Sequence, residues 1–146
     1  MEKVFHFDSS PDHYRADACV IACIDARFDL ATRKFLKRSG IATYDLVKIA
    51  GSAKALAAPD SDAARDFVAG NVRISKNLHG AARVLLIGHN DCGAYGGAPA
   101  GTIVADLFRA ADVLRAADPS LAVECYFADF DGVYRCDPAA AGTITP

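Results

Sequence analysis

The chain has 146 residues, of which 52% are hydrophobic and 23% charged, and its formal net charge is −2. This composition is typical of a globular chain that buries its own core and excludes a disordered one, so we expect one domain over residues 1–146. The small negative charge supplies no basic field for nucleic acid or for an anionic membrane surface, and we expect neither among its partners.

The N-terminal residues do not predict export. Residues 1–8 (MEKVFHFD) contain no apolar run of the kind found in a signal peptide, and no stretch reaches the roughly 20 apolar residues that a membrane span requires. The five cysteines are an odd number in a chain of ordinary size, which argues against a disulfide framework. We expect a cytoplasmic protein whose cysteines are metal ligands or buried core residues.

The first half of the chain alternates apolar runs with helical patterns. The continuous apolar run at residues 18–24 predicts a strand that is covered on both faces. A helix is predicted over residues 29–38, with Asp29 as a candidate N-cap. A second strand is predicted at residues 45–50, and the small residues and proline at 51–60 predict a loop.

The second half continues this alternation. A helix is predicted from Asp60 or Ser61 to about residue 78, with His79 and Gly80 closing it. One face of this helix is predicted to be apolar: Ala64, Phe67, Val68 and Val72. The remaining elements are predicted in this order: strand 83–88, helix 103–116, strand 121–127, an Asp131-Gly132 hairpin turn and strand 133–136.

Alternating strands and helices predict the fold class. We expect an α/β fold with a mostly parallel sheet of about four strands, an antiparallel edge strand and helices on both faces. Ligands of such sheets bind beyond the carboxyl ends of the strands, where the strand order reverses. Two polar motifs, at residues 23–27 and 89–92, each lie where a predicted strand ends and its loop begins. We therefore expect these two motifs to meet.

The two motifs together predict a zinc site. Cys23, His89 and Cys92 supply two thiols and an imidazole, which are ligands that Zn²⁺ accepts in tetrahedral geometry. If the first strand persisted past residue 24, alternation would point Cys23, Asp25 and Arg27 to the same side. The spacing of His89 and Cys92 is that of one helical turn, which lets both side chains reach one point.

The fourth metal position decides between two states of this site. A water bound there would become hydroxide near neutral pH, which is the arrangement of a catalytic zinc. Asp25 bound there instead would close the site. Arg27 can act as the switch, because its planar fork can hold a carboxylate by two hydrogen bonds and keep it off the metal.

The other cysteines and histidines have simpler interpretations. Apolar or strand-like surroundings predict that three cysteines are small core residues: Cys19, Cys125 and Cys136. The remaining histidines are expected on the surface or at helix ends: His6, His13 and His79. The glycine-rich run at 93–97 lacks a P-loop lysine pattern, which favours close packing beside the metal over phosphate binding.

The two motifs resemble those of the β-class carbonic anhydrases. Cys-x-Asp-x-Arg at residues 23–27 and Gly-His-x-Asp-Cys-Gly at residues 88–93 are similar to the family's motifs, and Ala-Cys-Ile-Asp-Ala-Arg at 22–27 resembles its small bacterial branch. Lys-Ile-Ala-Gly at 48–51 falls where the family has Arg-Asn-Ala-Gly, and residues 125–134 resemble its closing strand pair. The resemblance covers most of the chain, in pieces.

The resemblance implies a zinc lyase, a carbonate dehydratase that hydrates CO₂ reversibly to bicarbonate by a metal-bound hydroxide. It implies Cys23, His89 and Cys92 as the zinc ligands, with Asp25 and Arg27 as the catalytic dyad. It further implies a homodimer or higher homo-oligomer with the active site at the subunit interface.

Three departures from the family pattern concern the pocket and the dimer. Lys48-Ile49 replaces Arg-Asn, the N-terminal segment is short, and the stretch 93–124 is compact. Two alternatives therefore remain beside CO₂ hydration. The same zinc centre could hydrolyse carbonyl sulfide or carbon disulfide, or the chain could be a non-catalytic zinc-binding homologue in which Asp25 is the fourth ligand.

Overall fold

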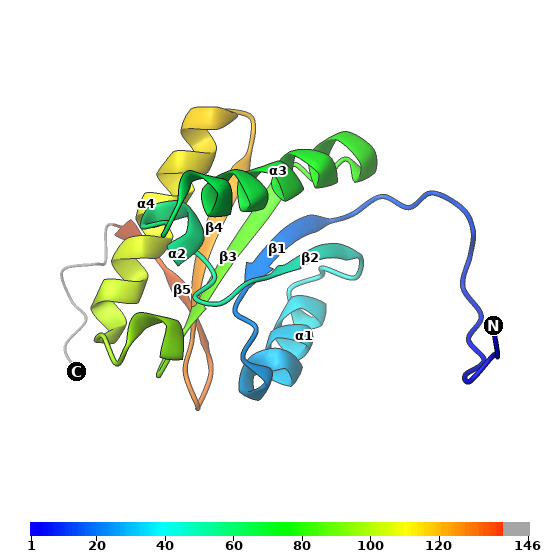
Figure 1. The fold of residues 1–146 in the computed structure, drawn as a ribbon, viewed down its shortest axis with the longest axis horizontal. Helices are drawn as coiled ribbons and strands as arrows, with labels where there is room; N and C mark the ends of the chain where they lie inside the picture. Colours follow the sequence, from blue (N-terminus) through cyan, green and yellow to red (C-terminus); the bar gives the residue numbers. More distant parts are fainter. Residues whose placement is uncertain (139–146) are drawn as a thin grey trace.

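A computed structural model describes residues 1–138 of the chain, and its centre is a five-stranded sheet (Figure 1). The strand order is β2-β1-β3-β4-β5; the first four strands are parallel to one another and β5 is antiparallel to β4. The strands are β1 (Ala18–Ala22), β2 (Tyr44–Lys48), β3 (Arg83–His89), β4 (Ala122–Ala128) and β5 (Val133–Cys136). The predicted parallel sheet and its antiparallel edge strand are confirmed.

Helices cover both faces of this sheet, as predicted. They are α1 (Asp29–Arg38), α2 (Lys54–Ala57), α3 (Asp62–His79) and α4 (Ala100–Ala117). Side chains of β1 alternate between two apolar clusters, because successive residues of a strand point to opposite faces. Val20 packs with Leu36 of α1 on one face, whereas Ile21 packs with Val68 of α3 and Leu107 of α4 on the other. None of the described helices is long and apolar enough to cross a membrane.

The ends of the long helices follow the sequence signals. The Ser61 hydroxyl accepts a hydrogen bond from the Ala64 N–H at 3.3 Å and caps α3, and Gly80 ends that helix with a φ of +72°. Phe67, however, is 61% exposed, because the core-facing side of α3 is set by Val68 and Val72. The expectation that Phe67 belongs to the buried face is wrong.

Three local features also differ from the expectation. The first strand ends at Ala22 rather than at residue 24, because the chain turns there into a short 3-10 helix, Ala26–Phe28. The predicted loop at 51–60 contains the helix α2, whose Lys-Ala-Leu-Ala sequence consists of strong helix formers. Asp29 does not cap α1; it lies in the first turn and forms an ion pair with Lys48 of β2.

A polar network joins three segments at the end of the sheet where β2 begins. The Asp45 carboxylate accepts hydrogen bonds from Tyr14, from Ser75 at 2.6 Å and from the His79 imidazole at 2.8 Å. Burial raises the pKa of Asp45, but these hydrogen bonds outweigh it, so the net pKa lies below the ordinary value. The network ties α3 and the segment before β1 to the edge strand.

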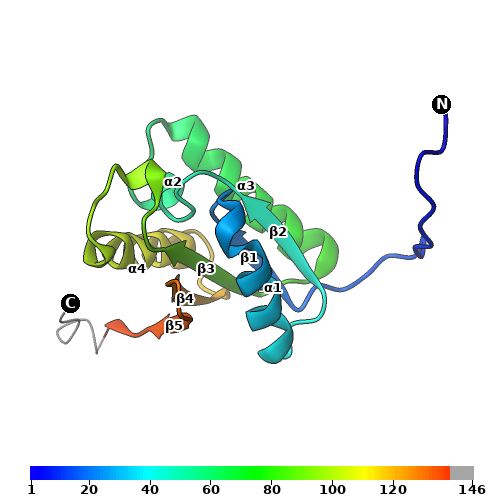
Figure 2. The same ribbon diagram turned by 90° about the horizontal axis from the view of Figure 1, so that it is seen from below.

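The segment that precedes Tyr14 lies outside this body. It is extended and projects away from the sheet in both views (Figures 1 and 2). Three of its large apolar side chains are 75–89% exposed: Val4, Phe5 and Phe7. Exposed apolar side chains of this kind are typical of surfaces that another molecule covers.

Candidate metal centre

The two predicted motifs meet at the carboxyl edge of the sheet. Cys23 directly follows β1 and His89 is the last residue of β3, and these two strands are parallel neighbours. Cys92 lies three residues beyond His89. The ligand atoms of these three residues are all within 4.8 Å of one another, as the sequence predicts, and His89 and Cys92 are buried.

The geometry of the cluster fits a tetrahedral zinc ion. The Cys23 and Cys92 Sγ atoms are 3.9 Å apart, close to the roughly 3.8 Å between two thiolates that bind tetrahedral zinc at about 2.3 Å. The His89 Nδ1 donates to the Asn90 carbonyl at 2.7 Å, which leaves Nε2 with a free lone pair. That Nε2 is buried and has no hydrogen-bond partner among residues 1–138.

A tight turn, not a helical turn, brings His89 and Cys92 together. Asp91 adopts a φ of +53°, and its N–H donates to the Asn90 Oδ1 at 2.8 Å. Asp and Asn tolerate this left-handed conformation better than other side chains. Cys92 then precedes a 3-10 helix, Gly93–Tyr95, and the His89 and Cys92 side chains converge as expected.

Asp25 and Arg27 form the predicted pair, although strand alternation does not place them. Asp25 follows the end of β1 and caps the 3-10 helix through its Oδ1, which accepts from the Arg27 N–H at 3.0 Å. The Arg27 side chain donates to the same carboxylate from Nε at 3.1 Å and from Nη2 at 2.7 Å. These hydrogen bonds lower the pKa of Asp25 to about 2, so the carboxylate is ionised.

Asp91 is a part of the site that the sequence reasoning missed. Its Oδ2 accepts from Arg27 Nη1 at 2.9 Å, and its backbone carbonyl accepts from Nη2 at 3.1 Å. Aromatic rings flank the same guanidinium, with the Phe28 and Phe130 centroids 5.8 and 5.7 Å from its central carbon. The sequence does show an acidic residue inside the second motif, but its spacing alone could not show which cationic side chain it contacts.

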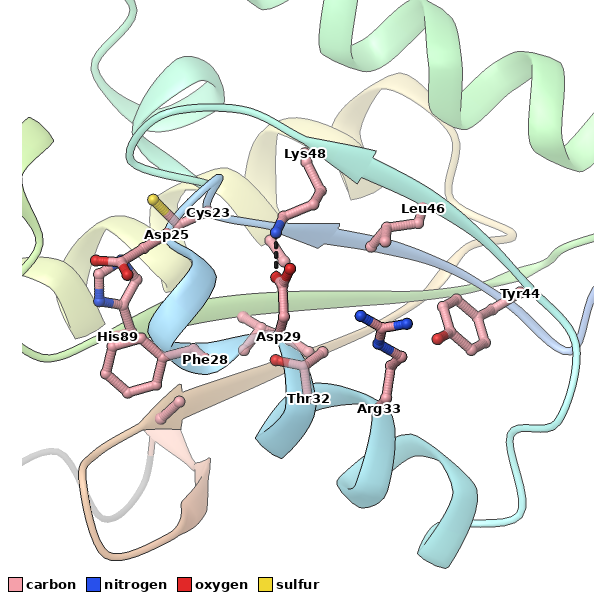
Figure 3. A pocket seen from close by; sticks show the side chains of 13 residues that line it. Cys23, Asp25, Phe28, Asp29, Thr32, Arg33, Tyr44, Leu46, Lys48 and His89 are labelled. Atoms are coloured by element: carbon pink, nitrogen blue, oxygen red, sulfur yellow. Dashed lines mark hydrogen bonds and ion pairs between the residues drawn. The ribbon is translucent and has the colours of Figure 1, made fainter. Parts of the chain in front are cut away.

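A cavity of about 220 Å³ opens beside the metal cluster (Figure 3). Cys23, Asp25 and His89 lie at one end of it, and Arg33 and Tyr44 lie at the other. The Lys48–Asp29 ion pair crosses the cavity between these ends (Figure 3), and Phe28, Ile87 and Ala128 contribute apolar wall. The volume is below the range of about 300–1,000 Å³ that is usual for drug-sized ligands, which favours a small ligand.

The two residues of the Lys48-Ile49 dipeptide lie in different surroundings, one in the cavity wall and one in the core. Lys48 lines the cavity, whereas Ile49 packs against the core cluster beneath α2 and α3. The structure therefore has a cation where the family motif has arginine, but an apolar contact where it has asparagine.

The three remaining cysteines are core residues, as expected. Cys19 and Cys125 are buried and Cys136 is half-buried. Burial raises the pKa of Cys19 and of Cys136 to about 11 and that of Cys125 to about 12, so these thiols stay neutral near pH 7.

Comparison with known sequences identifies a family. The family model described as "Putative carbonic anhydrase" matches residues 14–135. An uncharacterised protein of Rickettsia bellii (strain RML369-C) is 25% identical over 99 residues, a match that covers 64% of this chain and 60% of that protein. The chain thus matches less than two thirds of that relative's length.

Comparison with solved structures shows that the fold is shared with β-carbonic anhydrases. The carbonic anhydrase of Streptococcus mutans matches with a TM-score of 0.64 and 16% identity, over 90% of this chain and 88% of that chain. The β-carbonic anhydrase isoform I of Trichomonas vaginalis matches with a TM-score of 0.59 and 12% identity, over 89% of this chain and 87% of that chain. The family resemblance and the fold class expected from the sequence are confirmed.

Proposed function

The chain belongs to the carbonic anhydrase family whose model matches residues 14–135, and from this membership we propose that it is a zinc-dependent β-class enzyme that hydrates CO₂ reversibly to bicarbonate. The observation that carries the proposal is the side-by-side arrangement of a Cys23–His89–Cys92 cluster and an Asp25 carboxylate that Arg27 holds. A purely structural zinc site has four protein ligands and needs no cation to restrain a nearby carboxylate.

Three residues would hold the metal. Cys23 and Cys92 supply thiolates and His89 supplies the free Nε2, so the protein ligands balance the charge of Zn²⁺. The Asn90 carbonyl fixes the imidazole tautomer and ring orientation. When bound, zinc lowers the pKa of water from 15.7 to about 7 and so makes a nucleophile available at neutral pH.

Asp25 would orient the nucleophile. Because Arg27 keeps the carboxylate ionised, Asp25 only accepts hydrogen bonds, and its free lone pair can accept one from the O–H of the attacking oxygen. That contact turns the oxygen lone pair toward the carbon of CO₂. The same Arg27 contacts restrain Asp25 from becoming a fourth ligand, which supports the open state of the site.

The cavity chemistry agrees with a small substrate and an anionic product. The apolar wall formed by Phe28, Ile87 and Ala128 suits CO₂, which has no net charge or dipole. The cavity lining holds two cations, Lys48 and Arg33, and two carboxylates, Asp25 and Asp29. Lys48 pairs with Asp29, so Arg33 at the far end is the cation that an anion such as bicarbonate would meet.

Stopped-flow measurement of CO₂ hydration by the zinc-loaded protein tests the proposal. We expect activity that is lost in Cys92→Ser, which removes a ligand, and retained in Cys136→Ser, which removes a half-buried thiol outside the cluster. Activity of the unmodified protein no greater than that of Cys92→Ser would overturn the assignment. Sulfide release from carbonyl sulfide or carbon disulfide, without CO₂ hydration, would instead identify a hydrolase.

A further inference from the structure

We propose that Asp91 is a positioning residue: it fixes the Arg27 fork, and through that fork it keeps Asp25 away from the metal. The inference rests on the proposed metal site and goes beyond the Asp25–Arg27 pair. Asp91 belongs neither to the metal cluster nor to the cavity wall, so its side chain would act on the site through Arg27.

The contacts of Arg27 divide between two carboxylates. Nε and one hydrogen of Nη2 face Asp25, whereas Nη1 and the other hydrogen of Nη2 face the Asp91 side chain and backbone carbonyl. The planar guanidinium cannot turn one edge without turning the other. The Asp91 contacts therefore set the plane in which Arg27 presents its donors to Asp25.

This arrangement also joins the two loops that carry the ligands. Asp25 and Arg27 follow β1 and stand close to Cys23, whereas Asp91 lies between His89 and Cys92 after β3. Arg27 is thus a polar bridge across the same gap that the metal would span. A change at Asp91 would loosen that bridge without removing any ligand.

The local ion pair alone is expected to restrain Asp25 only weakly. The Arg27 and Asp25 side chains are 48% and 21% exposed, and an ion pair that solvent reaches contributes little to stability. With one anchor, Arg27 would sample other orientations, and Asp25 would spend more time at the fourth metal position. An anion that needs this position would then bind more weakly, because its apparent dissociation constant equals its intrinsic dissociation constant divided by the fraction of molecules in which the position is open.

Asp91→Asn isolates the charge from the backbone. Asn tolerates the left-handed conformation that Asp91 adopts at φ +53°, so the turn that presents His89 and Cys92 is preserved. Asp131→Asn is the matched control, because it removes an exposed carboxylate on the β4–β5 hairpin that contacts Tyr134 and not Arg27.

Azide binding to the cobalt-substituted protein, followed by visible absorption, is the test. Azide reports whether the fourth position is open, and the measurement needs no turnover. We expect Asp91→Asn to raise the apparent azide dissociation constant about two- to fivefold, the range that an exposed ion pair can supply. Asp131→Asn should leave it unchanged.

A double-mutant cycle with Asp25→Asn shows whether the effect passes through Asp25. In the Asp25→Asn background there is no carboxylate to close the site, so Asp91→Asn should no longer change azide binding. An unchanged constant in the single Asp91→Asn variant, a tighter one, or an equal change in both backgrounds would overturn the proposal. Each variant is first shown to bind one cobalt per chain.

The result of the azide-binding test can be distinguished from the result of the CO₂-hydration test. If the cobalt protein binds azide but the zinc protein does not hydrate CO₂, the proposed function fails and the azide cycle still tests Asp91. If CO₂ is hydrated and Asp91→Asn has no effect on azide, the function stands and the positioning role is rejected.

Discussion

At the scale of single residues, the site depends on the shape of Arg27 as much as on its charge. Its fork contacts Asp25 through two nitrogens and Asp91 through two, so four of its donor positions serve the neighbouring carboxylates and carbonyl. Lysine carries the same charge but offers a single ammonium on a flexible stem. It cannot maintain both sets of contacts.

Arg27→Lys should therefore lose most of the CO₂ hydration activity while keeping the metal. We expect kcat/KM to fall about a hundredfold, which is typical when a preorganised contact at the reacting centre is lost. Metal content, measured by atomic absorption, should remain one ion per chain. An Arg27→Lys variant with full activity would show that charge alone is sufficient at this position.

The residues of the site were predictable to different degrees. Cys23, His89 and Cys92 could be found because ligand type and position after two neighbouring strands are both visible in the sequence. The Asp25–Arg27 pair was found for its spacing, although a turn and not an extended strand creates it. Asp91 was missed because its partner lies on the other loop, and no local pattern specifies a contact across two loops.

At the scale of secondary-structure elements, the close approach of α4 to β3 positions His89, the proposed histidine ligand. Gly88 precedes His89, and a Cβ at residue 88 would lie 2.7 Å from Ile103 Cγ2 and 3.4 Å from Leu107 Cδ1. These side chains are nearly fully buried and have little room to move. Glycine is required here for packing, since its φ is not in the left-handed region.

Gly88→Ala should destabilise the protein by about 1–3 kcal/mol, the usual effect of overpacking a core. It should also weaken zinc binding, because the end of β3 must shift away from α4. Gly70→Ala is the matched control: it lies inside α3 with open space around its Cβ position, and should stabilise the protein by up to about 1 kcal/mol. Urea unfolding and zinc titration of both variants would check this, and equal effects of the two would contradict it.

The network around Asp45 predicts a pH-dependent stability at the opposite end of the sheet. The pKa of Asp45 lies below its ordinary value of about 3.9. A lowered folded-state pKa contributes stability above the unfolded-state value, and this stability is lost as the pH falls through the folded-state pKa. The hydrogen bonds to Ser75 and His79 should therefore weaken in acid.

Urea unfolding of the wild type and of Asp45→Asn between pH 7 and pH 3 measures this contribution. The variant should be less stable at pH 7, and the difference between the two proteins should shrink as the pH falls below 4. Asp12→Asn, which changes an exposed carboxylate that accepts a hydrogen bond from Ser10, is the control. A difference that stays constant with pH, or grows in acid, would contradict the lowered pKa of Asp45.

The elements themselves were largely predictable from local patterns. Local sequence predicts β1 and β3 from their apolar runs, and it predicts the turn before β5 from Asp131-Gly132. Tertiary contacts do not override these local preferences. The helix α2 was not predicted, because four residues are too few to show helical periodicity. Phe67 was misassigned because it is apolar and adjacent to Val68, and the sequence alone does not distinguish an exposed apolar residue from a buried neighbour.

At the scale of the whole molecule, the projecting N-terminal segment bears on assembly. Residues 1–13 leave the body of the protein in both views, and Phe5 and Phe7 are 77% and 75% exposed (Figure 2). In the homodimer or larger homo-oligomer that the family resemblance implies, we expect this segment to pack on a second copy of the chain. Burying such side chains contributes roughly 1.5–3 kcal/mol each.

Replacing Phe5 and Phe7 together by serine should weaken this association. Sedimentation equilibrium should show an oligomer for the unmodified chain and at least a tenfold larger dissociation constant for the double variant, since a tenfold change requires only about 1.4 kcal/mol. Replacing the polar Glu2 and Lys3 by serine is the control and should have little effect. A wild-type chain that is monomeric at high micromolar concentration would contradict this expectation.

The placement of the candidate ligands on two separate loops would make a bound metal ion a cross-link. Cys23 follows β1, whereas His89 and Cys92 follow β3, and β2 and three helices lie between them in the sequence. An ion that binds only the assembled cluster ties folding to metal supply: free zinc at a hundred times its dissociation constant would add about 2.7 kcal/mol to the free energy of unfolding. A chelator should lower the unfolding temperature of this protein, and scarcity of zinc would then limit how much folded protein persists as well as how much of it is active.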